Sequence, residues 1–176
     1  GWDSVMIRSD VELGGSDPFI VFADANIEET AKIATTARLQ NCGQSCISAK
    51  RFIVVQEIAE KFTELFKKEM ELLKVGDPMD ESTDVGPLYS MRGLEEIEKQ
   101  VNESVAKGAI VITGGKRLGG EGAFFAPTIL SNITKGMPAY DEEFFGPVAS
   151  VIVAKDEDDA IRIANDTRFG LGSSLW

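Results

Sequence analysis

Short runs of β-prone apolar residues alternate with longer segments of helical periodicity, and this alternation constrains the fold more than any other feature. The β-prone runs cover 19–22, 51–55, 109–113, 128–130 and 148–154. Apolar residues at helical spacing mark 27–40, 58–73 and 94–105, and a further helix is expected after Asp156, a plausible N-cap. Strands and helices that alternate at this spacing predict an α/β fold, an open and mostly parallel twisted sheet flanked by helices.

The bulk composition is that of one globular domain with an acidic surface. The 176 residues are 43% hydrophobic, enough for one autonomous core, and no internal repeat or linker interrupts them. The net charge of −11 repels nucleic acid backbones and anionic membrane surfaces, so neither is an expected partner. No apolar run approaches the ~20 residues that span a bilayer, and no signal peptide is evident, so the expected location is cytoplasmic.

Two cysteines stand four residues apart in "LQNCGQSCIS", residues 39–48, in a chain without histidine. A metal site is not expected, because zinc would have to be held by these two thiols and carboxylates. Cys42 and Cys46 could instead form a dithiol redox pair, although their spacing is not Cys-x-x-Cys. The pattern leaves two other interpretations open. One cysteine could be a nucleophile and the other inert, or both could be buried residues that only fill the core.

Three polar clusters fall at the ends of predicted elements: "VELGGSDP" (11–18), "NCGQSC" (41–46) and "EEFFGP" (142–147). Taken singly, Glu12 reads as a solvated acid, Cys46 as an inert buried thiol and Glu143 as a turn residue. Together they supply a thiol, a carboxylate and a Gly-rich segment whose backbone can come close to a ligand. These are the parts that nucleophilic catalysis with a general base requires. A thiol needs a base near neutral pH, and without histidine Glu12 is the candidate for that task.

These three motifs, in this order, resemble the signatures of the aldehyde dehydrogenase family. "VELGGSDP" resembles the family's active-site glutamate motif, "NCGQSC" its nucleophile motif and "EEFFGPV" its cofactor-ribose motif. The tail "NDTRFGLGSSLW" is also similar to a family segment. Within the family, "ELGGSDPFIV" and "AKRFIV" most resemble enzymes that oxidise succinate semialdehyde and similar short aldehydes.

The resemblance implies a role for each motif. Cys46 would attack the aldehyde and pass through a thiohemiacetal and a thioester, and Glu12 would activate the water that hydrolyses the thioester. Glu143 would hold the nicotinamide-ribose hydroxyls of NAD or NADP, with Phe145 beside the nicotinamide and Gly14 allowing the backbone to pass close to the cofactor. The substrate would be a small aldehyde.

The chain also departs from the family pattern. Ser16 stands where the family usually has lysine or asparagine. The resemblance covers 11–176 as a catalytic domain, while residues 1–10 are either divergent or artificially added. The family's dinucleotide-binding domain, an oxyanion-hole asparagine and the oligomerisation strand are not visible, so we expect a fragment of a longer enzyme that forms homo-oligomers. The isolated chain would then be inactive, and a non-catalytic folding or interaction unit is the alternative reading.

Overall fold

Six strands form one sheet in the computed structural model, which describes residues 13–176. They are β1 Pro18–Val21, β2 Arg51–Val55, β3 Ile110–Thr113, β4 Thr128–Ser131, β5 Val148–Ala154 and β6 Ser174–Leu175. The strand order is β3-β4-β5-β2-β1-β6, and every neighbouring pair is parallel except β3 and β4. The predicted α/β class with a mostly parallel sheet is therefore confirmed.

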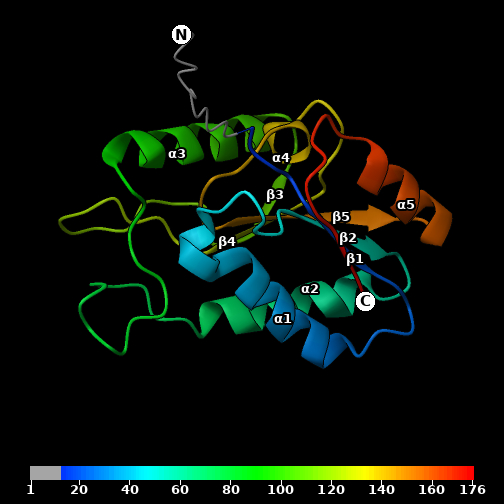
Figure 1. Cartoon of the computed structure of the whole chain (residues 1–176), viewed down its shortest axis with the longest axis horizontal. Helices are drawn as coiled ribbons and strands as arrows, with labels where there is room; N and C mark the ends of the chain where they lie inside the picture. The colour runs from blue at the N-terminus through cyan, green and yellow to red at the C-terminus, as the bar shows by residue number, and fades with distance from the viewer. Residues whose placement is uncertain (1–12) are drawn as a thin grey trace, which may run out of the picture.

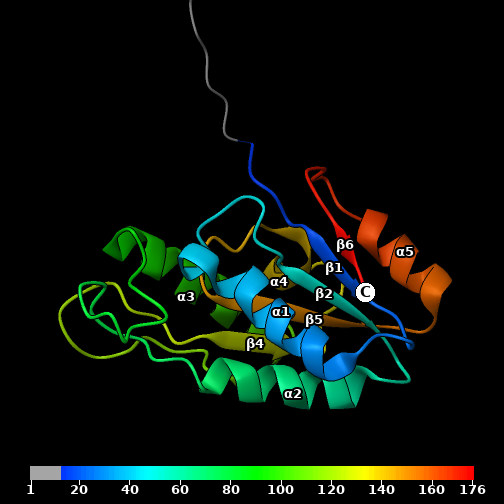
Figure 2. The same ribbon diagram turned by 60° about the horizontal axis from the view of Figure 1, so that its bottom comes forward.

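Helices cover both faces of this sheet (Figures 1 and 2). They are α1 Ile27–Leu39, α2 Ala59–Glu71, α3 Met91–Ala106, α4 Pro138–Asp141 and α5 Glu157–Asn165, with a 3₁₀ turn, η1, over Gln40–Gly43. Helices α1 and α2 lie against one face, and α3, α4 and α5 lie on the other. Asp156 caps α5 as predicted, because its side chain accepts a hydrogen bond from the Asp159 N–H at 2.9 Å.

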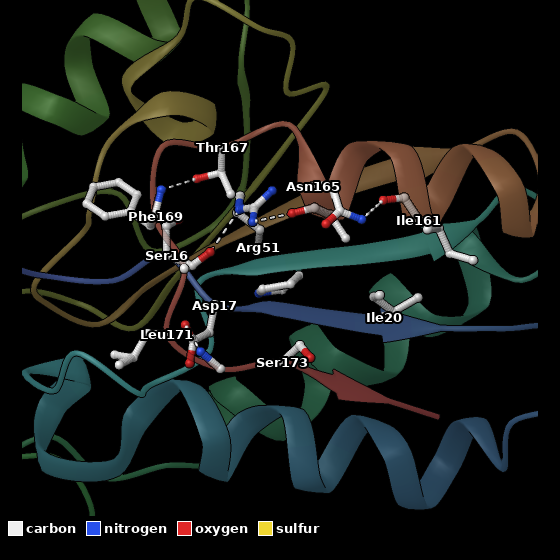
Figure 3. Close-up of a pocket in the computed structure, with 14 residues that line it drawn as sticks. Ser16, Asp17, Ile20, Arg51, Ile161, Asn165, Thr167, Phe169, Leu171 and Ser173 are labelled. Carbon is white, nitrogen blue, oxygen red and sulfur yellow. Dashed lines mark hydrogen bonds between the residues drawn. The ribbon is translucent and has the colours of Figure 1, made fainter.

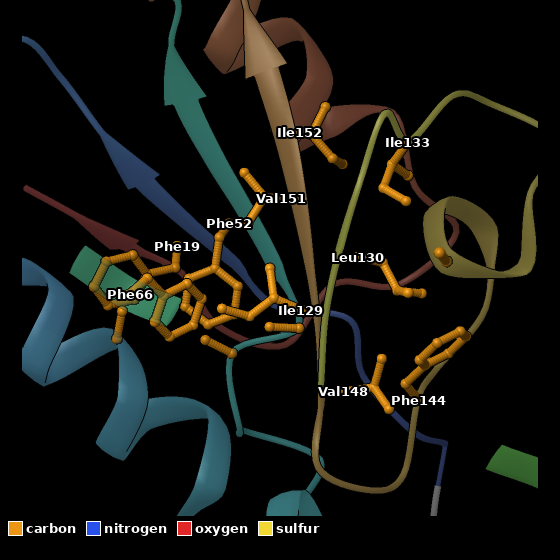
Figure 4. Close-up of a cluster of buried hydrophobic side chains, with 14 of the residues drawn as sticks. Phe19, Phe52, Phe66, Ile129, Leu130, Ile133, Phe144, Val148, Val151 and Ile152 are labelled. Atoms are coloured by element: carbon orange, nitrogen blue, oxygen red, sulfur yellow. The ribbon is translucent and has the colours of Figure 1, made fainter. Parts of the chain in front are cut away.

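The core has one apolar layer on each side of the sheet. Figure 4 shows Phe19, Phe52 and Phe66 on the side of α1 and α2, and Leu130 and Phe144 on the opposite side. Neighbouring residues of a strand point to opposite faces, so each strand supplies both layers. The Phe52 ring lies 5.2 Å from the Phe19 ring and 4.8 Å from the Phe66 ring, centroid to centroid. Burying each such side chain stabilises the fold by about 1.5–3 kcal/mol.

None of the helices in residues 13–176 is both long and apolar enough to cross a membrane. Two short elements, α4 and β6, were not predicted, because four and two residues are too few to establish a periodicity.

Candidate active site

Residues of all three polar clusters lie at the amino edge of the sheet. The clusters 41–46 and 142–147 lie there in full, and the cluster 11–18 contributes its described part, which begins at residue 13. Gly14 and Gly15 precede β1, Cys46 precedes β2, and Glu143 precedes β5. Because β1, β2 and β5 are parallel neighbours, the segments that lead into them end at the same edge. Open α/β sheets more often place their sites at the carboxyl edge, so this location depends on the loops and not on the general rule.

The loop that carries Cys46 begins with a sharp reversal of the chain. Helix α1 ends at Leu39, and then Asn41 (φ 54°) and Cys42 (φ 56°) both adopt the left-handed conformation. The helix expected over 27–40 therefore ends within one residue of the observed end, but the reversal that follows it was not expected. Side chains other than glycine rarely adopt two left-handed positions in succession, so the sequence carried no signal for this turn.

Gln44 fixes the loop after this reversal. Its amide nitrogen donates to the Asn41 carbonyl at 3.2 Å, and its amide oxygen accepts from the Tyr89 N–H at 2.7 Å. Gly43 (φ 73°) packs against the segment after Glu143, since an added Cβ would lie 2.2 Å from the Gly146 carbonyl oxygen. The loop is thus tied both to the start of α3 and to the Glu143 segment.

The two thiols have different surroundings, and neither forms a disulfide. Cys42 is buried, and burial raises the pKa of its thiol to about 11, although the positive charge of Arg38 acts in the opposite direction. Cys46 is only partly buried, and the next residue, Ile47, is exposed. Because the thiolate is the reactive form, the raised pKa leaves Cys42 almost entirely as the unreactive thiol at neutral pH, and a dithiol pair is not favoured.

Arg38 is a fully buried connector that sequence reasoning missed. Its guanidinium donates to the carbonyl oxygens of Ala49 (2.9 Å), Gly43 (2.6 Å) and Phe144 (3.4 Å). Burial lowers its pKa to about 9. The side chain therefore joins α1 to both sides of the Cys46 loop and to the residue that follows Glu143.

The Glu143 carboxylate lies against the two glycines before β1. Its Oε1 accepts a hydrogen bond from the Gly15 N–H at 3.0 Å. A Cβ on Gly14, which has a φ of 74°, would lie 2.4 Å from Oε2, so only glycine leaves room for the carboxylate here. The structure thus brings together Gly14 and Glu143, two of the residues expected at the site.

Lys50 completes this arrangement and was not expected from the sequence. The residue is 2% exposed. Its Nζ donates to the carbonyl oxygens of Ser45 (3.1 Å), Cys46 (3.1 Å) and Ser48 (2.9 Å) and lies 3.7 Å from Glu143 Oε1. Burial, followed by the charge of Arg38, lowers the pKa of Lys50 to about 8, against the raising effects of Glu143, Asp17 and Cys46.

A cleft of about 220 Å³ opens beside Glu143 and Phe145. Its other wall is made by Tyr89, which precedes α3, and by four residues of α3 itself: Gly93, Glu96, Ile97 and Gln100. Gln100 donates to the Glu143 main-chain carbonyl at 3.1 Å, which fixes that segment. The charged residues that line this cleft are both carboxylates, so it suits hydroxyl donors and disfavours phosphates. The contribution of α3 was missed because its polar residues read as the solvated face of an amphipathic helix.

A second cavity of about 380 Å³ lies between the start of β1 and the segment after α5 (Figure 3). Arg51 spans its floor, donating to the carbonyl oxygens of Ser16 (2.9 Å) and of Ile163 and Ala164 at the end of α5 (2.9 and 3.0 Å). Leu171 lies on its rim near Gly15, since a Cβ on Gly15 would approach the Leu171 Cδ2 to 3.2 Å. The tail segment thus supports the segment that leads into β1, whose Gly15 N–H donates to the Glu143 carboxylate.

Glu12, the expected general base, lies outside the described residues, and so does the segment 1–10. Within 13–176, no group of three or more histidine, cysteine or acidic side chains gathers as metal ligands would.

The sequence model of the aldehyde dehydrogenase family matches residues 3–176. Over 166 residues, 94% of this chain, the sequence is 57% identical to an NADP(+) succinate-semialdehyde dehydrogenase of Mycobacterium avium, and it covers 35% of that protein. A succinic semialdehyde dehydrogenase from Streptococcus pyogenes, solved with NADP+, is 39% identical and superposes with a TM-score of 0.90 over 94% of this chain and 36% of its own. A betaine aldehyde dehydrogenase from Staphylococcus aureus, solved with NAD+, is 34% identical with a TM-score of 0.90 over 94% of this chain and 34% of its own. The chain therefore spans about a third of the length of these relatives.

Proposed function

The chain belongs to the aldehyde dehydrogenase family, and from this premise we propose that it is the catalytic domain of an NAD(P)-dependent enzyme that oxidises a short aldehyde to its carboxylate. Succinate semialdehyde is the first substrate to test, because two of the relatives are named for it. One observation carries the proposal: the Gly15 N–H holds the Glu143 carboxylate at 3.0 Å, at the edge where the partly exposed Cys46 thiol lies.

The proposed reaction begins at Cys46. The Cys46 thiolate attacks the aldehyde carbon, and the new S–C bond gives a thiohemiacetal whose oxygen would be stabilised by the Cys46 N–H. The C–H bond of this intermediate then breaks with loss of hydride, and a thioester remains on the sulfur. Bound NAD(P) would supply the hydride acceptor. Glu12 removes a proton from water, the water attacks the thioester, and the carboxylate leaves as the thiolate is regenerated.

The cleft beside α3 supports the cofactor assignment. Glu143 and Glu96 are hydrogen-bond acceptors suited to ribose hydroxyls, and Phe145, which is 40% exposed, offers an apolar surface for a nicotinamide ring. Two carboxylates repel the pyrophosphate of a dinucleotide, so its phosphates must bind elsewhere. We therefore propose that residues outside this chain hold the phosphate and adenine parts of NAD or NADP.

The decisive experiment replaces the two thiols separately in the full-length enzyme. Cys46→Ser should abolish aldehyde oxidation, because an alcohol is a far weaker nucleophile than a thiolate at neutral pH. Cys42→Ala is the matched control and should keep most of the activity, since the Cys42 thiol is buried. Steady-state oxidation of succinate semialdehyde near the wild-type rate by Cys46→Ser would refute the mechanism.

The isolated 176-residue chain should behave differently from the full-length enzyme. Its 43% hydrophobic content predicts that it folds, but we expect no measurable NAD(P)-dependent oxidation, because most cofactor contacts would be missing. Circular dichroism would check folding and a spectrophotometric assay would check activity. Steady turnover by the purified chain would contradict the proposed division of the cofactor site.

A further inference from the structure

We propose that Lys50 is a positioning residue that couples the Cys46 loop to the carboxylate of Glu143 and thereby sets how firmly the enzyme holds the cofactor ribose. This inference rests on the proposed function. It assigns a task to a buried cation that the reaction steps above do not use.

The first step of the argument is the number of contacts that Lys50 makes. An ammonium group has three N–H donors, and Nζ of Lys50 has three carbonyl acceptors, those of Ser45, Cys46 and Ser48. All three belong to the loop around the proposed nucleophile. The side chain therefore fixes the backbone on both sides of the Cys46 sulfur, and at 2% exposure it has little freedom to turn away.

The second step is the short list of groups that hold the Glu143 side chain. Among the described residues, its carboxylate has one hydrogen bond, from the Gly15 N–H at 3.0 Å, and one ion pair, with Lys50 at 3.7 Å. Both contacts involve Oε1. Lys50 thus draws one oxygen toward the loop, which leaves Oε2 as the freer acceptor for a ribose hydroxyl.

The third step is the charge environment of the ammonium. Arg38 on α1, Asp17 before β1, Cys46 in its own loop and Glu143 before β5 face Lys50. Burial and Arg38 outweigh the three acidic groups and lower the pKa of Lys50 to about 8. As the pH rises through 8, Lys50 loses its charge and one N–H donor. The attraction on Glu143 then disappears, and the cofactor should bind more weakly.

A double-mutant cycle in the full-length enzyme tests this coupling. The variants are Lys50→Met, Glu143→Gln and the double variant, with Lys155→Met as the matched control because that lysine side chain is 82% exposed. The main measurement is the dissociation constant of NAD(P), obtained by fluorescence titration without substrate. Lys50→Met should weaken binding about tenfold, within the range for groups in contact, and the effect should fall below about threefold in the Glu143→Gln background.

The pH profile of binding provides a test that does not need the Lys50 variant to fold. For wild-type enzyme the dissociation constant should rise between about pH 7 and 9, and for Glu143→Gln the rise should disappear. A rise that persists in Glu143→Gln would overturn the proposal. So would equal effects of Lys50→Met in the two backgrounds, or an effect no larger than that of Lys155→Met.

The failure of this inference is distinguishable from failure of the proposed function. A wild-type enzyme that neither binds NAD(P) nor oxidises aldehydes would overturn both. A wild-type enzyme that does both, while Lys50 and Glu143 act independently, would overturn only the role of Lys50.

Discussion

Substitution of Gly15 by alanine should damage the site more than the fold. A Cβ at this position would lie 2.4 Å from the Cys46 carbonyl oxygen and 3.2 Å from Leu171 Cδ2. The Leu171 side chain can move, but the Cys46 oxygen is backbone and is held by Lys50 at 3.1 Å. The strain must therefore be relieved by moving the loop that carries the thiol or by moving the Gly15 segment.

The size of this displacement sets the expected effect. Relaxing 2.4 Å to an ordinary C···O contact of ~3.3 Å requires a shift of about 1 Å. Overpacking of this kind costs about 1–3 kcal/mol in the free energy of unfolding. A misplacement of about 1 Å at a reacting group can cost ~10²-fold in rate, so kcat should fall by about two orders of magnitude.

The assay compares Gly15→Ala with Gly119→Ala in the full-length enzyme. Gly119 is the matched control, because a Cβ added there would meet nothing within 4 Å. Urea unfolding gives the change in stability, and initial rates with succinate semialdehyde give kcat. If the two variants have the same kcat, the close approach of Gly15 to the Cys46 loop does not affect catalysis and the reasoning is wrong.

Three further predictions address other residues. Glu12→Gln in the full-length enzyme should give a burst of reduced cofactor followed by slow turnover in stopped-flow traces, because thioester hydrolysis loses its base; equal loss in both phases would argue against that role. The raised pKa of Cys42, from 9.0 to about 11, means that its buried neutral thiol contributes stability fully below pH 9 and loses it as the pH rises through 11, a change of ~3 kcal/mol. Cys42→Ala should therefore flatten the decline of unfolding free energy over pH 9–11, and an unchanged slope in urea titrations would assign that decline to other groups. Gly43→Ala should lower the unfolding free energy by about 3 kcal/mol or more. The added Cβ would lie 2.2 Å from the Gly146 carbonyl oxygen, and the residue has a φ of 73°. A melting temperature equal to that of the wild type would contradict the packing described.

The sequence predicted the regular elements well because their periodicity is strong. The strand expected at 19–22 is β1 at Pro18–Val21, and the run at 51–55 is β2. What periodicity could not supply was the strand order, in which β5 lies between β4 and β2, and the antiparallel pairing of β3 with β4. Pairing depends on contacts between residues far apart in the chain, and no local pattern encodes them.

Of the candidate site, the sequence predicted only the residues that belong to the three motifs. Glu143 and Gly14 were expected and lie together, but Lys50 and Arg38 were not singled out. A lysine or arginine at the end of an element is normally exposed, so burial of both was not the expected outcome. Both side chains donate to backbone carbonyl oxygens that come together only after folding. The position of a carbonyl group cannot be predicted from residue types.

The position of β5 also determines when the two halves of this sheet can join. A chain made from its amino end holds β1 and β2 as one piece and β3 and β4 as another until residues 148–154 insert between them. Until then β2 and β4 each present an unpaired edge, which is where nascent chains associate wrongly. The hydrogen bond from Gly15 to Glu143 spans 128 positions in sequence, so the site can assemble only near the end of folding. Slow or interrupted synthesis before Val148 should therefore favour aggregation over a partly active product.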